Sequence, residues 1–114
     1  MYKRVVITGM GVITPVGSTL RDFWGALLAG KSGIGLLDRF DTTNFSSKIA
    51  AQIKGFDPTQ FIPEKEMTRI DPFVQYALGA SQMALDDSGL DLSKVDPDNV
   101  GVLVGSGIGG LKTI

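Results

Sequence analysis

Residues 100–110 read VGVLVGSGIGG, an apolar run that passes directly into a glycine-rich turn. The run from Val100 to Val104 lacks the polar alternation of a half-exposed strand, so it predicts a strand that is covered on both faces. Four of the six residues from Gly105 to Gly110 are glycines, which predicts a tight turn where that strand ends. Ligands of α/β proteins gather beyond the carboxyl ends of strands, so this turn is the first candidate for a binding site.

Elsewhere, the chain alternates between predicted strands and predicted helices. Residues 4–8, RVVIT, form another continuous apolar run and predict a second buried strand. A helix is predicted from Thr19, which has the spacing of a capping box with Asp22, and Gly30 marks its end. Its apolar residues recur at the spacing of one helical face: Leu20, Phe23, Trp24, Leu27 and Leu28.

The second half of the chain predicts one more long helix. Asp71 is its expected N-cap, Pro72 its first residue, and Gly89 lies just past its end. Residues 31–68 contain many turn-forming residues and predict an excursion with a short strand or hairpin near 49–53 and one helical turn near 58–61. Residues 91–99 predict a polar loop.

This order of elements predicts the fold class. Strands that are separated by helices pair in parallel through right-handed crossovers, which gives an α/β fold with a mainly parallel sheet. Two or three strands make an incomplete sheet with open edges, which complete domains normally cover or close. We therefore expect residues 1–114 to be one portion of a larger unit.

Composition excludes several classes of function. The 114 residues are 43% hydrophobic and 20% charged, which is typical of a soluble globular protein, and the net charge of −1 gives no field that would gather nucleic acid or an anionic membrane. The chain has no cysteine and no histidine, so it carries no thiolate nucleophile, no imidazole base and none of the commonest zinc ligands. The absence of a disulfide framework is compatible with the cytoplasm. The apolar start of the chain is interrupted by Gly9, Gly11 and Pro15, so it predicts neither a signal peptide nor a membrane span.

The turn at residues 105–110 also satisfies the G-x-G-x-x-G pattern of dinucleotide sites. That pattern requires a following helix and an acidic residue about 20 positions later, and neither can be tested in this sequence. Glycines that merely permit a tight turn are the simpler alternative.

Six spaced motifs resemble those of the β-ketoacyl-[acyl carrier protein] synthases, the condensing enzymes of fatty acid elongation. The longest match runs from Arg4 to Gly17, and the others follow in order: Phe23-Trp24, Leu28 to Ile34, Arg39-Phe40-Asp41, Gln75-Tyr76-Ala77 and Gly105 to Leu111. The resemblance is strongest to the type II synthases, and polyketide ketosynthases and their chain-length-factor relatives share much of the pattern. It implies a thiolase-like fold of layers α-β-α-β-α, usually a homodimer, of which residues 1–114 are the N-terminal portion of the N-terminal domain, ending before the nucleophile.

The resemblance also implies a reaction and two sites. Family members form an acyl-cysteine, decarboxylate malonyl-carrier protein and join the two by Claisen condensation, with two assisting histidines. No catalytic residue, cofactor or metal is expected within this chain. Ile108, between Gly107 and Gly109, matches a family residue that lines the acyl tunnel and moves when a chain binds; a core-filling role is the alternative.

Lys65 and Arg69 match positions that present basic residues to acyl carrier protein, although Thr68 stands where another basic residue is common. An ordinary solvated pair is the alternative for these two residues. Asp86 and Asp87 are adjacent on a predicted helix, where neighbours do not face each other, so we expect solvated carboxylates and no acid/base pair.

Overall fold

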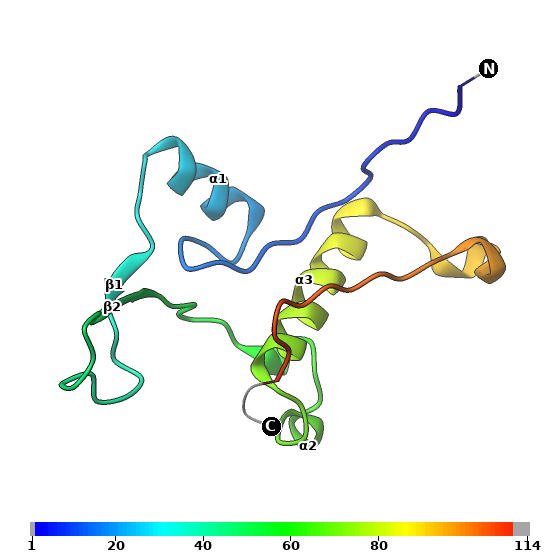
Figure 1. Ribbon diagram of the computed structural model, residues 1–114. Coiled ribbons are helices and arrows are strands. Elements are labelled where there is room, and N and C mark those ends of the chain that lie inside the picture. Colours follow the sequence, from blue (N-terminus) through cyan, green and yellow to red (C-terminus); the bar gives the residue numbers. More distant parts are fainter. Residues whose placement is uncertain (1, 111–114) are drawn as a thin grey trace. The chain divides into compact units, whose positions relative to one another are not determined.

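The computed structural model describes residues 2–110, which divide into two compact units (Figure 1). One unit is residues 12–57. The other combines the N-terminal segment up to residue 11 with everything from residue 58 onward. The predicted acyl-tunnel residues and both predicted docking residues lie in this second unit.

The first unit begins with helix α1, Leu20–Leu28, whose two ends are as predicted. Thr19 caps the start: its Oγ1 accepts a hydrogen bond of 3.1 Å from the Asp22 N–H and donates one of 2.9 Å to Asp22 Oδ2. At the other end Gly30 has a φ of 62°, and the N–H groups of Gly30 and Lys31 donate to the carbonyls of Leu27 and Ala26. This is the Schellman arrangement, which satisfies carbonyls that the helix leaves open.

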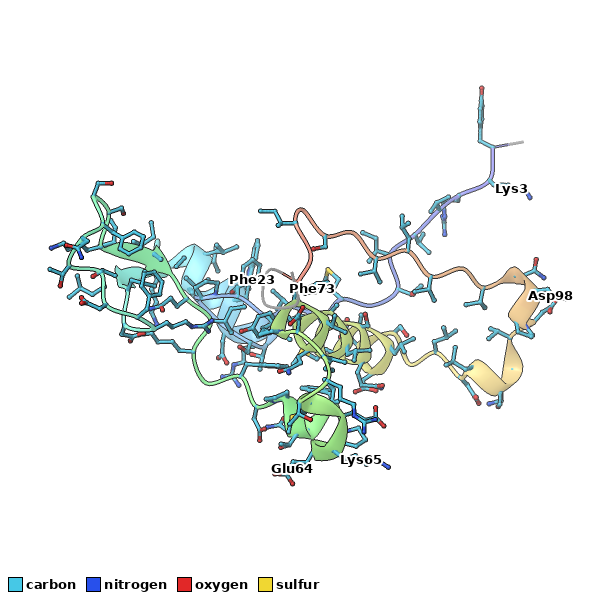
Figure 2. All side chains as sticks on the ribbon, turned by 60° about the horizontal axis from the view of Figure 1, so that its bottom comes forward. Lys3, Phe23, Glu64, Lys65, Phe73 and Asp98 are labelled. Atoms are coloured by element: carbon cyan, nitrogen blue, oxygen red, sulfur yellow. The ribbon has the colours of Figure 1, made fainter. Side chains whose placement is uncertain are left out.

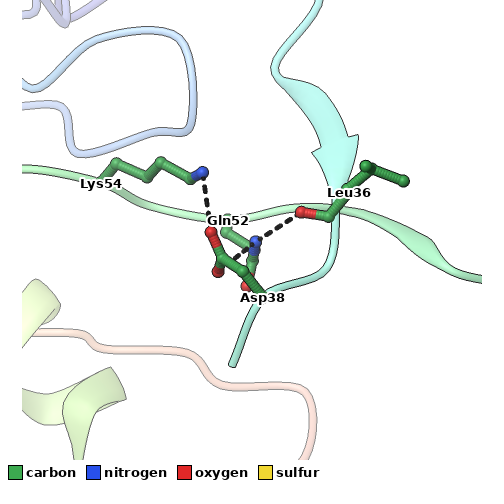
Figure 3. A network of polar contacts seen from close by, with 4 residues as sticks. All are labelled: Leu36, Asp38, Gln52 and Lys54. Atoms are coloured by element: carbon green, nitrogen blue, oxygen red, sulfur yellow. Dashed lines mark hydrogen bonds and ion pairs between the residues drawn. The ribbon is translucent and has the colours of Figure 1, made fainter. Parts of the chain in front are cut away.

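A two-stranded antiparallel hairpin completes this unit. Strand β1, Ile34–Leu36, pairs with β2, Ile49–Ala51, in the register Ile34 to Ala51 and Leu36 to Ile49. The predicted strand near residues 49–53 is thus confirmed, whereas β1 was not predicted. Beyond the paired residues, Gln52 Nε2 donates to the Leu36 carbonyl (3.3 Å) and to Asp38 Oδ1 (3.1 Å), and Lys54 Nζ lies 3.1 Å from Asp38 Oδ2 (Figure 3). These polar contacts extend the pairing of the two arms past the short ladder.

Helix α3, Pro72–Ser88, is the main element of the second unit. It starts at Pro72 and stops at Gly89, whose φ is 61°, as the sequence predicts. Asp71 occupies the N-cap position but its side chain makes no capping hydrogen bond; its carbonyl oxygen accepts from the N–H groups of Val74 and Gln75. A 3-10 turn η1, Pro58–Gln60, confirms the predicted helical turn, and a four-residue helix α2, Glu64–Met67, which was not predicted, leads into α3.

The predicted polar loop at residues 91–99 consists of two 3-10 turns. These are η2, Leu92–Lys94, and η3, Pro97–Asn99. Each is preceded by an aspartate whose carboxylate accepts a backbone N–H two residues on, from Ser93 to Asp91 and from Asp98 to Asp96. These caps explain why a polar, aspartate-rich stretch forms short turns.

The N-terminal segment lies with its backbone close against α3. A Cβ at Gly9 would lie 2.3 Å from the Ala84 carbonyl oxygen, and one at Gly11 would lie 1.9 Å from the Ala80 carbonyl oxygen. The small residues Ala84 and Ala80 of α3 thus pack against Gly9 and Gly11, which have no side chain. The Met10 N–H, between the two glycines, donates to Asp87 Oδ2 at 2.9 Å.

The predicted strands at residues 4–8 and 100–104 are not formed in the part of the chain that the structure describes. The sheet found there is antiparallel and belongs to the hairpin, so the predicted parallel sheet is not confirmed. Both segments run as single chains, in the same direction past α3 in Figures 1 and 2. Their apolar side chains are mostly exposed, from 45% for Val100 to 98% for Leu103. A strand forms only where another strand supplies ladder hydrogen bonds, and neither segment has such a partner among residues 2–110.

Few side chains of residues 2–110 are fully enclosed. Ala26 in α1 and Ile62 before α2 are the buried apolar residues, at 7% and 4% exposure. The apolar face of α1 is largely open, with Trp24 and Leu28 more than half exposed. Such extensive exposed apolar surface is unusual for a complete soluble domain and marks surfaces that other polypeptide covers.

Candidate functional site

The glycine-rich turn presents Ile108 to the outside. Ser106 Oγ accepts a hydrogen bond of 3.0 Å from the Gly109 N–H, and Gly109 has a φ of 79°, a conformation that favours glycine. Ile108 is 72% exposed. The turn is therefore fixed by one local hydrogen bond, while its apolar side chain is left available for another apolar group.

Open space surrounds this turn among the described residues. A Cβ at Gly105 or at Gly107 would meet no atom within 4 Å. Neither close packing nor a positive φ therefore requires glycine at these two positions. These glycines leave the backbone before Ile108 free to change conformation at little steric cost, as the predicted movement of a tunnel residue requires.

A groove of about 350 Å³ lies beside the segment that leads into the turn. One wall is α3 together with Leu90, and the other walls are the two single-chain segments, through Thr8 and Gly9 and through Gly101 to Leu103. The groove thus brings together the two predicted strands over the same helix. It places them at one site even though they are not hydrogen-bonded to each other.

The second predicted site is a corner between α2 and α3. Lys65 on α2 and Arg69 just after it are both exposed, and no ion pair of either is found among residues 2–110. Glu64 and Glu66 on the same short helix are exposed as well, and Figure 2 shows Glu64 and Lys65 projecting outward from α2. The two cations are available to an acidic partner, although neighbouring acidic side chains weaken their field.

Backbone and side-chain hydrogen bonds fix the shape of this corner. The Glu66 N–H donates to the Pro63 carbonyl at 2.8 Å, and the Arg69 N–H donates to the Glu66 carbonyl at 3.0 Å. Gln75, in the first turn of α3, reaches back and donates through Nε2 to the carbonyls of Met67 and Ile70, each at 3.2 Å. Sequence reasoning did not identify Gln75 as a site residue, because nothing local indicates which carbonyls a glutamine four positions into a helix will meet.

The adjacent carboxylates on α3 accept hydrogen bonds from different partners. Both Asp86 and Asp87 are exposed, as predicted. Asp86 Oδ1 accepts from Gln82 Nε2 at 2.8 Å, whereas Asp87 Oδ2 accepts from the Met10 N–H. Asp87 thus has a structural contact that the sequence did not reveal, because its partner is 77 residues away.

Within residues 2–110, no three side chains of aspartate, glutamate, histidine or cysteine are grouped so that they could hold a metal ion. No helix in that range is both long enough and apolar enough to span a bilayer.

The family model of the β-ketoacyl synthase N-terminal domain matches residues 2–114. The chain belongs to the β-ketoacyl synthase family. Known relatives include the 3-oxoacyl-[acyl-carrier-protein] synthase 2 of Vibrio cholerae, 49% identical over 112 residues, and that of Synechocystis, 46% identical over 112 residues. Each alignment covers 98% of this chain and 27% of the relative, so the chain spans about a quarter of the length of these synthases.

Solved ketosynthases have the same local fold as this β-ketoacyl synthase chain. The ishigamide ketosynthase/chain length factor superposes with a TM-score of 0.69 at 33% identity, over 79% of this chain and 22% of that one. A type II PKS acyl-carrier protein in complex with its ketosynthase bound to the hexaketide gives a TM-score of 0.65, also at 33% identity, over 85% of this chain and 25% of that one. The thiolase-like class predicted from sequence is therefore confirmed, while the details of its sheet are not.

Proposed function

We propose that the full-length protein is a 3-oxoacyl-[acyl-carrier-protein] synthase of fatty acid elongation. The observation that carries this proposal is the identity of 49% across 98% of the chain to a synthase of that name. In the proposed reaction an acyl group moves from its carrier thioester to a cysteine thiol of the enzyme and frees the carrier thiol. Malonyl-carrier protein then loses CO₂, and the resulting carbanion attacks the acyl thioester carbonyl and releases the cysteine thiolate.

Residues 1–114 contribute binding surfaces to this reaction and no reacting group. The chain has no cysteine and no histidine. The nucleophile and the histidines that stabilise the enolate therefore belong to the remaining three quarters of the proposed enzyme. We place the enzyme in the cytoplasm as a homodimer, in line with the family resemblance.

The complete fold would pair the two single-chain segments in a parallel sheet. Residues 4–8 and 100–104 run in the same direction, border the same groove over α3 and expose most of their apolar side chains. Continuous apolar strands of this kind are normally covered on both faces. We propose that they become neighbouring strands of the layered α-β-α-β-α fold when the rest of the polypeptide covers them.

Within the enzyme, Ile108 would line the channel for the acyl chain. Its exposed apolar side chain and the unconstrained glycines before it support this role. An apolar channel wall gains free energy from each methylene that it covers, roughly 0.8 kcal/mol per buried CH₂.

Lys65 and Arg69 would receive the acidic surface of acyl carrier protein. Both are exposed and free of ion pairs within the described chain, so neither needs to break a contact before it binds. Complementary charge mainly accelerates encounter. The departure from the family pattern at Thr68 leaves this site with less positive charge than many relatives would have.

Two measurements test the proposal. The full-length protein, incubated with acyl- and malonyl-carrier protein, should release CO₂ and form the 3-oxoacyl product, and residues 1–114 alone should form none. The double variant Lys65→Glu/Arg69→Glu should raise KM for the carrier protein and leave kcat unchanged. Arg21→Glu/Lys31→Glu, which changes the net charge equally in the other unit, is the matched control. Equal effects of the two double variants would refute docking at α2.

A non-catalytic partner subunit is the second candidate, because one solved relative is a ketosynthase/chain length factor. A full-length protein that forms no product alone but co-purifies with an active ketosynthase, and restores product in its presence, would support this second candidate. A nucleotide-binding module is a further reading of the turn at residues 105–110. A shift of the melting temperature of the full-length protein by a dinucleotide would favour it over the channel.

A further inference from the structure

We propose that Gln75 is a positioning residue for carrier-protein docking. It holds the corner that carries Lys65 and Arg69 without contacting the partner itself. This inference rests on the proposed docking function of those two cations. It starts from the observation that a half-buried side chain of α3 is hydrogen-bonded to backbone on both sides of Arg69.

Helix α2 has little intrinsic stability. It is four residues long, and Pro63 at its N-cap makes no side-chain capping hydrogen bond. A helix of about one turn does not repay the cost of nucleation by itself, and its last carbonyls have no partner within the helix. External hydrogen bonds are therefore needed to keep Lys65 in one orientation.

Gln75 supplies such bonds at the open end of α2. Its Nε2 atom has two hydrogens, and it lies 3.2 Å from the Met67 carbonyl and 3.2 Å from the Ile70 carbonyl. Met67 is the last residue of α2, and Ile70 immediately precedes the N-cap of α3. The two bonds therefore bracket residues 68 and 69 and tie them to a helix of 17 residues.

The bracket fixes the two cations before a partner arrives. The backbone N–H of Gln75 is itself bonded to the Asp71 carbonyl, so the glutamine is anchored in the first turn of α3. A loop that is already ordered loses less conformational entropy when it binds, and its affinity is correspondingly higher. Loss of the bracket should leave both charges in place while their relative position becomes variable.

The test compares Gln75→Met with Gln82→Met in the full-length enzyme. Methionine keeps the length and helix preference of glutamine and removes its donors. Gln82 is the matched control, since it lies on the same helix, is exposed, and bonds only to Asp86 within the described residues. Gln75→Met should raise KM for malonyl-carrier protein about three- to tenfold with kcat unchanged, as expected for a loss of pre-ordering. Gln82→Met should leave both constants unchanged.

Two further readouts separate positioning from general damage. In Gln75→Met, the Arg69 N–H should exchange with solvent faster, because Arg69 lies between the two carbonyls that Gln75 holds and its bond to the Glu66 carbonyl depends on that turn. In a Lys65→Gln/Arg69→Gln background, Gln75→Met should have no additional effect on KM. Equal KM values for Gln75→Met and Gln82→Met, or an unchanged Arg69 exchange rate, would overturn the proposal. So would a fall in kcat that accompanies the rise in KM.

A shorter side chain provides a second variant if Gln75→Met does not fold. Gln75→Asn keeps an amide but lacks the methylene needed to reach the two carbonyls, and the same rise in KM is expected. The proposed docking function fails separately, if Lys65→Glu/Arg69→Glu does not change KM. In that case the exchange rate of the Arg69 N–H still tells whether Gln75 holds the corner.

Discussion

The backbone N–H of Met10 donates a hydrogen bond of 2.9 Å to Asp87 Oδ2 and thereby joins the N-terminal segment to the last turns of α3. On either side of this bond, Gly9 and Gly11 approach the helix so closely that a Cβ would overlap carbonyl oxygens of Ala84 and Ala80. The segment is thus seated on α3 by one carboxylate and two glycines. Substitutions at Gly11 and at Asp87 test these contacts separately.

Gly11→Ala should destabilise the protein by about 1–3 kcal/mol, because the added methyl group would overlap backbone that cannot rotate away. Chemical denaturation of the full-length protein measures the change in the free energy of unfolding. Gly25→Ala in α1 is the control, since this residue is exposed, its Cβ would meet nothing within 4 Å and its φ is not positive. Equal free energies of unfolding for the two variants would mean that the segment does not sit on α3 as described.

Asp87→Ala should cost about 1 kcal/mol more than Asp86→Ala, because only Asp87 accepts a hydrogen bond from the N-terminal segment. Both substitutions gain the same helix propensity, so their difference reports the contact with Met10 less the exposed Gln82 hydrogen bond that Asp86→Ala removes. Exchange of the Met10 N–H, followed by NMR, should accelerate in Asp87→Ala and not in Asp86→Ala. The same exchange rate in both variants would contradict the bond.

Ile108→Phe should shorten the acyl chains that the full-length enzyme accepts, because the larger side chain would fill the proposed channel. The assay is kcat/KM across a series of acyl-carrier proteins of increasing chain length, with a steep fall for the longer members. Ile108→Val, which removes one methylene, is the control and should accept the longer chains at least as well as the parent. An unchanged length preference in Ile108→Phe would show that Ile108 does not face the acyl chain.

The hairpin carries a pH-sensitive contact between Asp38 and Lys54. The hydrogen bond from Lys54 lowers the pKa of the Asp38 carboxyl below its ordinary value of 3.8, with a further lowering by Gln52. Because the folded pKa lies below the unfolded one, any stabilisation is present above the unfolded pKa and is lost as the pH falls through the folded pKa. An NMR titration of Asp38 should give a midpoint below 3.8 that moves back toward 3.8 in Lys54→Met. Lys48→Met should leave the midpoint in place; a midpoint that stays low in Lys54→Met would contradict the assigned cause.

The start and the end of helices α1 and α3 depend on neighbouring residues, so they could be predicted from the sequence. Thr19 and Asp22 are three residues apart, and Gly30 follows the last helical turn, so the start and the end of α1 follow from neighbouring residues. The same holds for Pro72 and Gly89 at the ends of α3. The resemblance of spaced motifs likewise identified the family that the comparison with known proteins confirmed.

Contacts between distant residues could not be predicted from the pattern of the sequence. The strands at residues 4–8 and 100–104 were predicted from composition, but a strand requires a partner, and these residues have none in the described structure. The bonds of Gln75 to the carbonyls of Met67 and Ile70 depend on how the chain turns between α2 and α3, and no residue type in the sequence predicts the geometry of that turn. The roles of Ile108, Lys65 and Arg69 remain predictions that the experiments above address.

The seating of the N-terminal segment on α3 also sets an order of events during synthesis. Residue 10 leaves the ribosome long before residue 87, and joining them closes a loop across a sequence separation of 77 residues. Helix α3 has only local backbone hydrogen bonds to make and can form at once, whereas residues 4–11 must wait until α3 has been translated. The β-branched run at residues 4–8 is therefore accessible to chaperones for most of the time that this region takes to be synthesised.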